Sequence, residues 1–291
     1  MDNRRDVDGL GALALVGFSA LLAFNQVVIK VTGGGFDPVF QAGIRSVGAT
    51  FVILLWMRLR GLRFDNQPGV MFWGTISGTL FAYEFVCLFI ALDVTTVARA
   101  SIMFYTMPIW LSIAAHFVLP GERLTGVRML GLVCGMSGVV WALVDRGDGQ
   151  GNLFGDLIAL AGSLGWAAIA LLVRLTPLAR VQAETQMLFQ LVPSAVILLA
   201  LAPLFGDMIR EPETIHYAAL AFQMICVASL GFLSWFYLMK VYKANGVASF
   251  AFLSPVFAVL FGWLILGEET GVQIWGALAL VAAGIFLING R

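Results

Sequence analysis

The stretch Gly11-Ala-Leu-Ala-Leu-Val-Gly-Phe-Ser19 has a counterpart in Gly155-Asp-Leu-Ile-Ala-Leu-Ala-Gly-Ser163, 144 residues further along the chain. The same offset relates Val52-Ile-Leu-Leu55 to Val196-Ile-Leu-Leu199. Apolar segments that recur in the same order indicate an internal duplication. We therefore expect two related halves, residues 9–145 and 153–290.

A second pattern repeats later in each half. Pro108, Gly121-Glu122 and Gly138 are followed at an offset of 146 or 147 residues by Pro255, Gly267-Glu268 and Gly284. Each proline removes a backbone hydrogen bond inside an apolar segment, which favours a hinge or an ordinary packing kink. The repeated glutamates fall at segment ends, so we expect them to stabilise helix ends and not to bind a substrate.

The composition indicates a membrane protein. Hydrophobic residues make up 60% of the chain, charged residues 12%, and the mean hydropathy is +0.93. Such a chain has too little polar surface for a water-soluble domain of this length. The formal net charge is zero and basic runs are lacking, which argues against a nucleic-acid partner.

Apolar runs of about 20 residues are long enough to cross the hydrocarbon core as helices. The sequence predicts an all-α integral membrane fold with ten such helices, at residues 10–32, 37–57, 68–92, 96–119, 125–145, 153–176, 183–205, 216–241, 246–266 and 272–290. Because each half has five helices, the second half must enter the membrane from the opposite side. Inverted repeats of this kind are a transporter architecture.

The loop charges predict the orientation. If the N-terminus lies inside, the inner side holds 12 Lys and Arg residues and the outer side only four, namely Lys30, Arg99, Arg146 and Arg210. Cytoplasmic loops carry the excess of positive charge. We expect both termini in the cytoplasm of a multi-pass inner-membrane protein, with the central linker and Asp145, Asp148 and Asp156 outside.

Several motifs together carry a family resemblance. Leu22-Ala-Phe-Asn25 leads to Lys30 in the first helix, Trp166-Ala leads to Arg174 in the sixth, and the proline then Gly-Glu pattern occurs twice. With the duplicated five-helix unit, the whole chain resembles the drug/metabolite transporter superfamily with its ten-helix EamA-type exporters. Within it, the chain is most similar to bacterial exporters of aromatic amino acids. The resemblance implies export of small organic solutes by alternating access.

Two charged residues lie at matched depth inside predicted helices. Arg45 follows Asp37 by eight residues and Glu84 precedes Asp93 by nine, which places both about 12 to 13 Å below the outer surface. Buried charges in membranes are costly and usually functional or paired. Glu84 is therefore a candidate proton or substrate-amine site. The alternatives are a structural ion pair with Arg45 and a carboxylate turned towards a water-filled vestibule.

Further polar and aromatic side chains lie away from the membrane interfaces, where they could line a cavity for an aromatic solute. The candidates for substrate binding, besides Glu84, are Asn25, Tyr83, Ser101, Tyr105, Trp166, Tyr237 and Phe252. For any one of them, interhelical packing is the simpler explanation. Taken together, these residues favour a hydrophilic path for a solute through the membrane.

Small residues predict close helix contacts without a substrate role. Gly131 and Gly135 in the fifth helix, and Ala279 and Ala283 in the tenth, have the four-residue spacing that lets backbones approach.

Other classes of function are less well supported by the sequence. No nucleotide-binding motif, HExxH motif or Ser/His pairing occurs, so we expect neither enzyme activity nor a cofactor. His116 and His216 have no metal-binding companions at suitable spacing, so no metal site is predicted. A channel would need a pore lined by repeated charges or carbonyl loops.

Overall fold

The computed structural model describes residues 6–119, 124–144, 151–242, 250 and 252–289, and within these residues the fold is helical apart from an isolated bridge between Phe36 and Ile209. The first half contains α1 (Gly9–Gly33), α2 (Pro38–Arg60), α3 (Val70–Val94), α4 (Val97–Phe104), α5 (Met107–Val118) and α6 (Gly126–Val144). The second half contains α7 (Leu153–Leu175), α8 (Ala183–Leu201), α9 (Thr214–Phe222), α10 (Phe232–Val241), α12 (Leu253–Leu266) and α13 (Val272–Asn289).

The predicted membrane spans correspond to these helices. In the part of the chain that the structure describes, eight spans are long and apolar enough to cross a bilayer, among them Val97–Val118, which joins α4 to α5, and Thr214–Trp235. Two shorter apolar helices, Leu253–Leu266 and Val272–Ile288, occupy the places of the ninth and tenth predicted spans. The expected all-helical membrane fold is confirmed.

Local sequence signals set several helix boundaries. The Asp37 carboxylate accepts hydrogen bonds from the Val39 and Phe40 N–H groups at 2.9 and 3.1 Å, and Pro38 occupies the first turn of α2. Asn152 caps α7 in the same way. α1 ends at Gly33, the first of three consecutive glycines. Side-chain acceptors at these positions satisfy N–H groups that have no partner within the helix.

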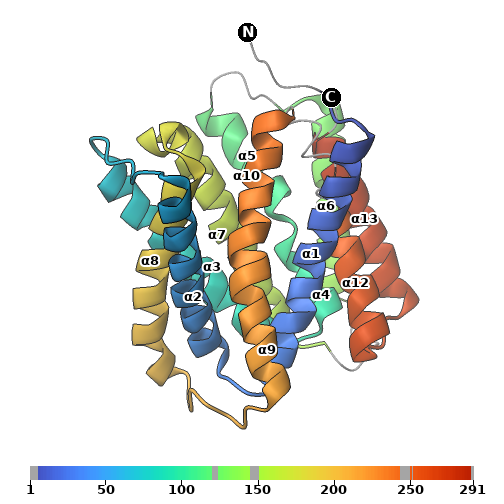
Figure 1. Ribbon diagram of the computed structural model, residues 1–291. Coiled ribbons are helices and arrows are strands. Elements are labelled where there is room, and N and C mark those ends of the chain that lie inside the picture. The colour runs from blue at the N-terminus through green and yellow to red at the C-terminus, as the bar shows by residue number, and fades with distance from the viewer. Residues whose placement is uncertain (1–5, 120–123, 145–150, 243–249, 251, 290–291) are drawn as a thin grey trace.

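The helices stand side by side in one bundle, with α1 beginning and α13 ending at the same end (Figure 1). We call this the terminal end, and it also holds the end of α2 and the loop before α3. The opposite end, here the far end, holds the end of α1, the end of α3 and the start of α7. Within the described residues, the eight spans and the two shorter apolar helices run in alternating directions, so the second half begins at the far end.

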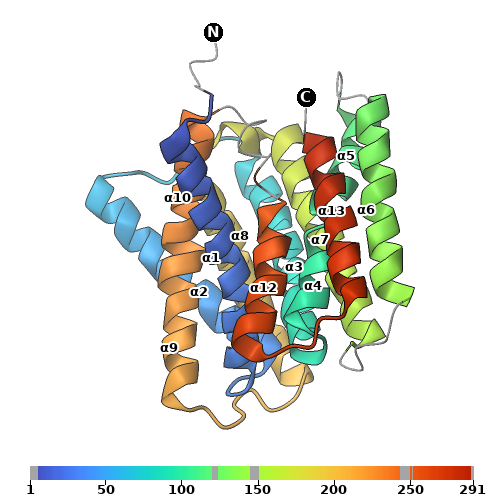
Figure 2. The ribbon, with the colours of Figure 1, turned by 90° about the vertical axis from the view of Figure 1, so that its right-hand side faces the viewer.

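Helix packing follows the duplication. α6 packs on α13 and α2 on α8, and each pair joins equivalent helices of the two halves. The contacts of α1 with α12 correspond to those of α7 with α4 and α5. Figure 2 shows α6 and α13 side by side at the edge of the bundle. The two halves therefore interlock as one bundle.

Glycines hold α6 against α13. A Cβ atom at Gly284 would lie 2.6 Å from the Gly135 nitrogen and 2.7 Å from the Gly131 carbonyl oxygen, so no larger residue fits. The close approach expected of Gly131 and Gly135 is confirmed. The expectation for Ala279 and Ala283 is wrong, because both are exposed on the other side of α13.

A π-helical segment interrupts the eighth span. Residues Gln223–Gly231 lie between α9 and α10, and their hydrogen bonds skip one residue more than in an α-helix. The segment packs against α1 and α2. The sequence predicts one regular helix here, because a shift in backbone hydrogen bonding has no compositional signal.

Candidate functional site

The fourth span is broken in the middle of the bundle. α4 ends at Phe104, α5 starts at Met107, and Tyr105 and Thr106 lie between them. Pro108 is the second residue of α5 and cannot donate to the preceding turn. Pro255 likewise lies in the first turn of α12. The span is thus broken beside Pro108, where the sequence favours a hinge or a packing kink, and the hinge role of both prolines stays a prediction.

A buried hydrogen-bond network surrounds the break on the side of α1 and α12. The Tyr105 hydroxyl lies close to the polar side chains of Gln26 and Ser254. Ser101, one turn earlier on α4, donates to the Gln26 side-chain oxygen. All four side chains are at most 5% exposed. The network therefore links both halves at the break, and two of its members, Ser101 and Tyr105, are predicted site residues.

On its other side the break is bonded to α7. The Thr106 hydroxyl donates to the Ser163 hydroxyl at 3.1 Å, and the Trp110 indole N–H donates to Thr106 at 3.1 Å. Thr106 and Trp110 are missing from the sequence prediction, because a threonine and a tryptophan in an apolar helix give no signal of a break beside them.

Three aromatic rings meet beside the same break. The Phe104 and Trp166 rings are stacked, with centroids 5.2 Å apart and an interplanar angle of 21°. Tyr105 meets Trp166 edge-on at 6.1 Å. The structure brings the two predicted site residues Tyr105 and Trp166 together. We call Phe104, Tyr105 and Trp166 the aromatic cluster.

Three other predicted residues lie outside the aromatic cluster. Tyr237 on α10 is 67% exposed and Tyr83 on α3 is 45% exposed. The Tyr83 ring lies against Gly165 of α7. Phe252, the counterpart of Tyr105 in the second half, contacts Phe286 of α13 at 5.8 Å. The position of each residue along its helix places it away from the membrane interfaces. The direction in which its side chain points depends on tertiary packing.

Arg45 and Glu84 are both buried, at 3% and 5% exposure. Among the described residues they form no ion pair within 4.0 Å and interact electrostatically at longer range. The Arg45 guanidinium instead lies 4.3 Å from the centroid of Phe85 and 5.7 Å from that of Phe89. Aromatic faces stabilise the arginine charge. A contact ion pair between Arg45 and Glu84 is therefore absent in this conformation.

Several buried polar atoms at this level have no hydrogen-bond partner. They include Arg45 Nε, Glu84 Oε2, Asn25 Oδ1, Gln41 Oε1 and Gln223 Oε1. Each residue lies about 5 to 15 Å along its helix from the far end. Buried polar atoms without partners are costly, so this polar layer is suited to bound water or a polar ligand.

The far end is closed by polar contacts between the halves. Arg99 Nη2 lies 2.7 Å from Asp156 Oδ2, and both side chains are fully buried. Thr95 donates to the same carboxylate at 3.0 Å. Arg99 and Asp156, which the sequence places on the outer side, lie in α4 and in the first turn of α7, where they are buried against each other. Asp145 and Asp148 fall outside the described residues.

Glu268 closes the far end by a second contact. Its carboxylate accepts hydrogen bonds from the Val97 and Ala98 N–H groups at 2.7 and 3.1 Å, at the first turn of α4. Lys30 lies 4.0 Å away and donates to the Thr95 carbonyl oxygen. The helix-end role expected of Glu268 is observed, whereas Glu122 lies outside the described residues.

A solvent-facing pocket of about 330 Å³ lies beside this contact, lined by Lys30, Asp93, Val94, Thr95, Thr96, Leu266, Gly267 and Glu268. At its edge, Arg210 forms an ion pair with Asp93 at 2.8 Å, and this hydrogen bond raises the pKa of Arg210. Ion pairs between described residues thus gather at the far end. Within the same residues, no group of three His, Cys, Asp or Glu side chains could hold a metal ion.

Both halves of the chain match one family of known proteins. The model of the EamA-like transporter family matches residues 9–144 and again residues 153–290. Among curated proteins, the chain is 24% identical to the uncharacterized transporter YoaV of Bacillus subtilis, with 94% of this chain and 95% of that protein covered. It is 23% identical to the uncharacterized inner membrane transporter YedA of Escherichia coli K12, with 94% and 90% covered.

A further relative and a solved structure agree over the full length. The uncharacterized protein PA1977 of Pseudomonas aeruginosa is 28% identical, with 96% of this chain and 93% of that protein covered. A crystal structure of a protein of 23% identity aligns with a TM-score of 0.69, over 95% of this chain and 97% of the other. At this identity the solved structure supports the fold alone.

Proposed function

Because the chain belongs to the EamA-like transporter family, we propose that it exports small organic solutes, with aromatic amino acids as the favoured class, by alternating access. Membership of the family makes it a multi-pass membrane transporter. The class of substrate, the direction of transport and the mechanism are the proposal.

The observation that carries the proposal is the broken fourth span. Of its two unwound residues, Tyr105 lies beside polar side chains of α1 and α12, and Thr106 is hydrogen-bonded to α7. In transporters built from inverted repeats, substrate sites lie near the midplane at discontinuous helices between the repeats. A relative movement of the two halves must therefore change the contacts of this break.

The aromatic cluster supports an aromatic substrate. The Trp166 face is stacked on Phe104 in this conformation, and an aromatic solute could take the place of that contact. Aromatic pairs contribute roughly 0.5 to 1.5 kcal/mol beyond the burial of surface. The polar layer contains both a guanidinium, Arg45, and a carboxylate, Glu84, which match the two charges of an amino acid. Asn25 would add an amide anchor at the same level.

We further propose that the terminal end faces the cytoplasm, as the excess of Lys and Arg residues in its loops predicts. The contacts of Arg99 with Asp156 and of Glu268 with α4 then close the outer side. In that orientation the described conformation is shut towards the outside.

Counterflow in proteoliposomes tests the proposal. Liposomes loaded with unlabelled phenylalanine should accumulate labelled phenylalanine transiently, and loading with alanine should give less accumulation. A carrier produces this overshoot because solute exchange is faster than net loss, whereas a channel produces none. No counterflow with any of the twenty amino acids would reject the aromatic amino acid proposal. Chemical conversion of the solute would indicate an enzyme.

A further inference from the structure

The final part of α2 carries an apolar stripe that faces away from the bundle. Phe51, Leu54, Leu55 and Leu59 are between 47% and 75% exposed, whereas Ile53 and Met57 between them are buried. Their spacing of three and four residues places the exposed side chains on one face of the helix. In a membrane protein such a face contacts lipid chains.

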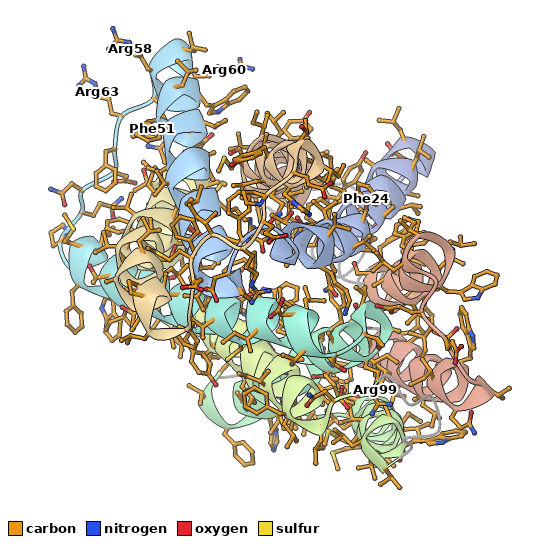
Figure 3. All side chains as sticks on the ribbon, turned by 90° about the horizontal axis from the view of Figure 1, so that it is seen from below. Phe24, Phe51, Arg58, Arg60, Arg63 and Arg99 are labelled. Atoms are coloured by element: carbon orange, nitrogen blue, oxygen red, sulfur yellow. The ribbon has the colours of Figure 1, made fainter. Side chains whose placement is uncertain are left out.

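The stripe ends in arginines at the terminal end. Arg58 continues the exposed face, since it follows Phe51 by seven residues and Leu54 by four. Gly61 then turns the chain in the left-handed conformation at φ 65°, and Arg63 follows. Figure 3 shows Arg58, Arg60 and Arg63 extending away from the bundle at the end of α2, with Arg58 and Arg63 on one side.

These charges have no counterion among the described residues. Among the described residues, no carboxylate lies within 4.0 Å of Arg58, Arg60 or Arg63. Arg60 is held over the Trp56 ring at 4.6 Å, and the nearby Asp65 accepts from Gln67. The three exposed guanidinium groups suit the anionic headgroup of a phospholipid, and the apolar stripe beside them suits its acyl chains.

We propose that the end of α2 is a binding site for an anionic phospholipid. The headgroup phosphate lies between Arg58 and Arg63, and the acyl chains follow Phe51, Leu54, Leu55 and Leu59 towards the middle of the membrane. Arg60, held by Trp56, faces neighbouring headgroups on the other side of the helix. The site is separate from the aromatic cluster and the polar layer, so it does not depend on the transported solute.

Native mass spectrometry of the purified full-length protein tests the site. The protein is titrated with phosphatidylglycerol and, separately, with phosphatidylcholine of the same acyl chains. We expect phosphatidylglycerol to bind more tightly. Each arginine near anionic lipid is worth about 1 kcal/mol, or about fivefold in affinity. Arg58→Gln should therefore weaken phosphatidylglycerol binding about fivefold, and Arg58→Gln with Arg63→Gln more than tenfold.

Two further variants separate the site from general charge and folding effects. Arg128→Gln removes an arginine from the same end of the bundle, on α6, and should leave the lipid preference unchanged. Replacing Arg58 and Arg63 by Lys keeps the charges and should retain most of the preference. Unaltered melting temperatures without added lipid show that the variants are folded.

Four results would overturn the proposal. They are equal binding of the two lipids, an equal loss of preference in Arg128→Gln, full competition by inorganic phosphate at the lipid concentration, and a dimer that disappears when Leu55 is replaced by Asn. The third result would assign the arginines to a free anion, and the fourth would assign the stripe to a second copy of the chain.

Discussion

Arg99 and Asp156, both fully buried, join α4 of the first half to α7 of the second by an ion pair of 2.7 Å. Removing one partner breaks this buried pair, which typically costs about 3 to 5 kcal/mol. We therefore expect Arg99→Gln or Asp156→Asn to lower the melting temperature of the purified protein strongly, as measured by intrinsic fluorescence.

The double variant Arg99→Gln with Asp156→Asn should lose less stability than the two single variants together. Arg210→Gln breaks an ion pair that is partly exposed and serves as the control, with an expected loss below about 1 kcal/mol. Additive losses would show that the buried pair does not act as a unit.

Glu268→Gln should loosen the far end. A carboxylate accepts from both Val97 and Ala98, whereas an amide has one acceptor oxygen, so one N–H group of α4 loses its partner. A reporter thiol at the buried Leu92 should then react faster with an impermeant maleimide, in a background without Cys87, Cys134 and Cys226.

The neighbouring Glu269→Gln makes the same chemical change at an exposed position and should leave the Leu92 thiol protected. If both variants react alike, the cap on α4 does not keep the far end closed.

The orientation can be tested with two exposed loop residues of the described chain. A thiol at Asn66, in the loop before α3, should be labelled only from the cytoplasm, and one at Asp207, in the loop after α8, only from outside. A thiol at Asp148, outside the described residues, should behave like Asp207. Labelling of Asn66 in intact cells by an impermeant reagent would reverse the orientation.

Trp166→Ala should weaken transport of an aromatic solute several-fold, since the stacking surface of the aromatic cluster is lost. Transport of a small aliphatic solute should fall less, and Trp166→Phe should retain part of the activity. Trp141→Ala on α6, where the ring is 43% exposed, is the control. An equal loss for both solutes would assign Trp166 to packing, and the readout is initial uptake rate in proteoliposomes.

Glu84→Gln tests whether this carboxylate exchanges protons during transport. We expect normal amounts of folded protein and the loss of the pH-dependent part of the transport rate, because glutamine keeps the shape but cannot titrate. Glu84→Asp should keep a pH dependence. Unchanged pH profiles in Glu84→Gln would leave the carboxylate a structural or substrate-binding role.

Much of the fold is predictable from the sequence, because membrane helices need long apolar runs and marked ends. Asp37-Pro38 and the glycines after Thr32 indicate helix boundaries that the structure contains. The duplication likewise predicts which helices are equivalent.

The site is only partly predictable. Tyr105 and Trp166 meet, whereas Tyr83 and Tyr237 are exposed, because the position of a residue along its helix does not determine the direction of its side chain. The pairing of Arg99 with Asp156 depends on two helices 57 residues apart, and neither residue differs in type from an ordinary loop charge.

The π-helical segment has one more consequence. A π turn contains more residues than an α turn, so the chain rotates less per residue from Gln223 to Gly231. The side chains of α10 therefore point in other directions than a continuous α-helix from Thr214 would give them. In the eighth span, the side chains before Gln223 and those after Gly231 therefore follow two different rotational settings about the helix axis. The apolar and polar faces of the two parts must be assigned separately.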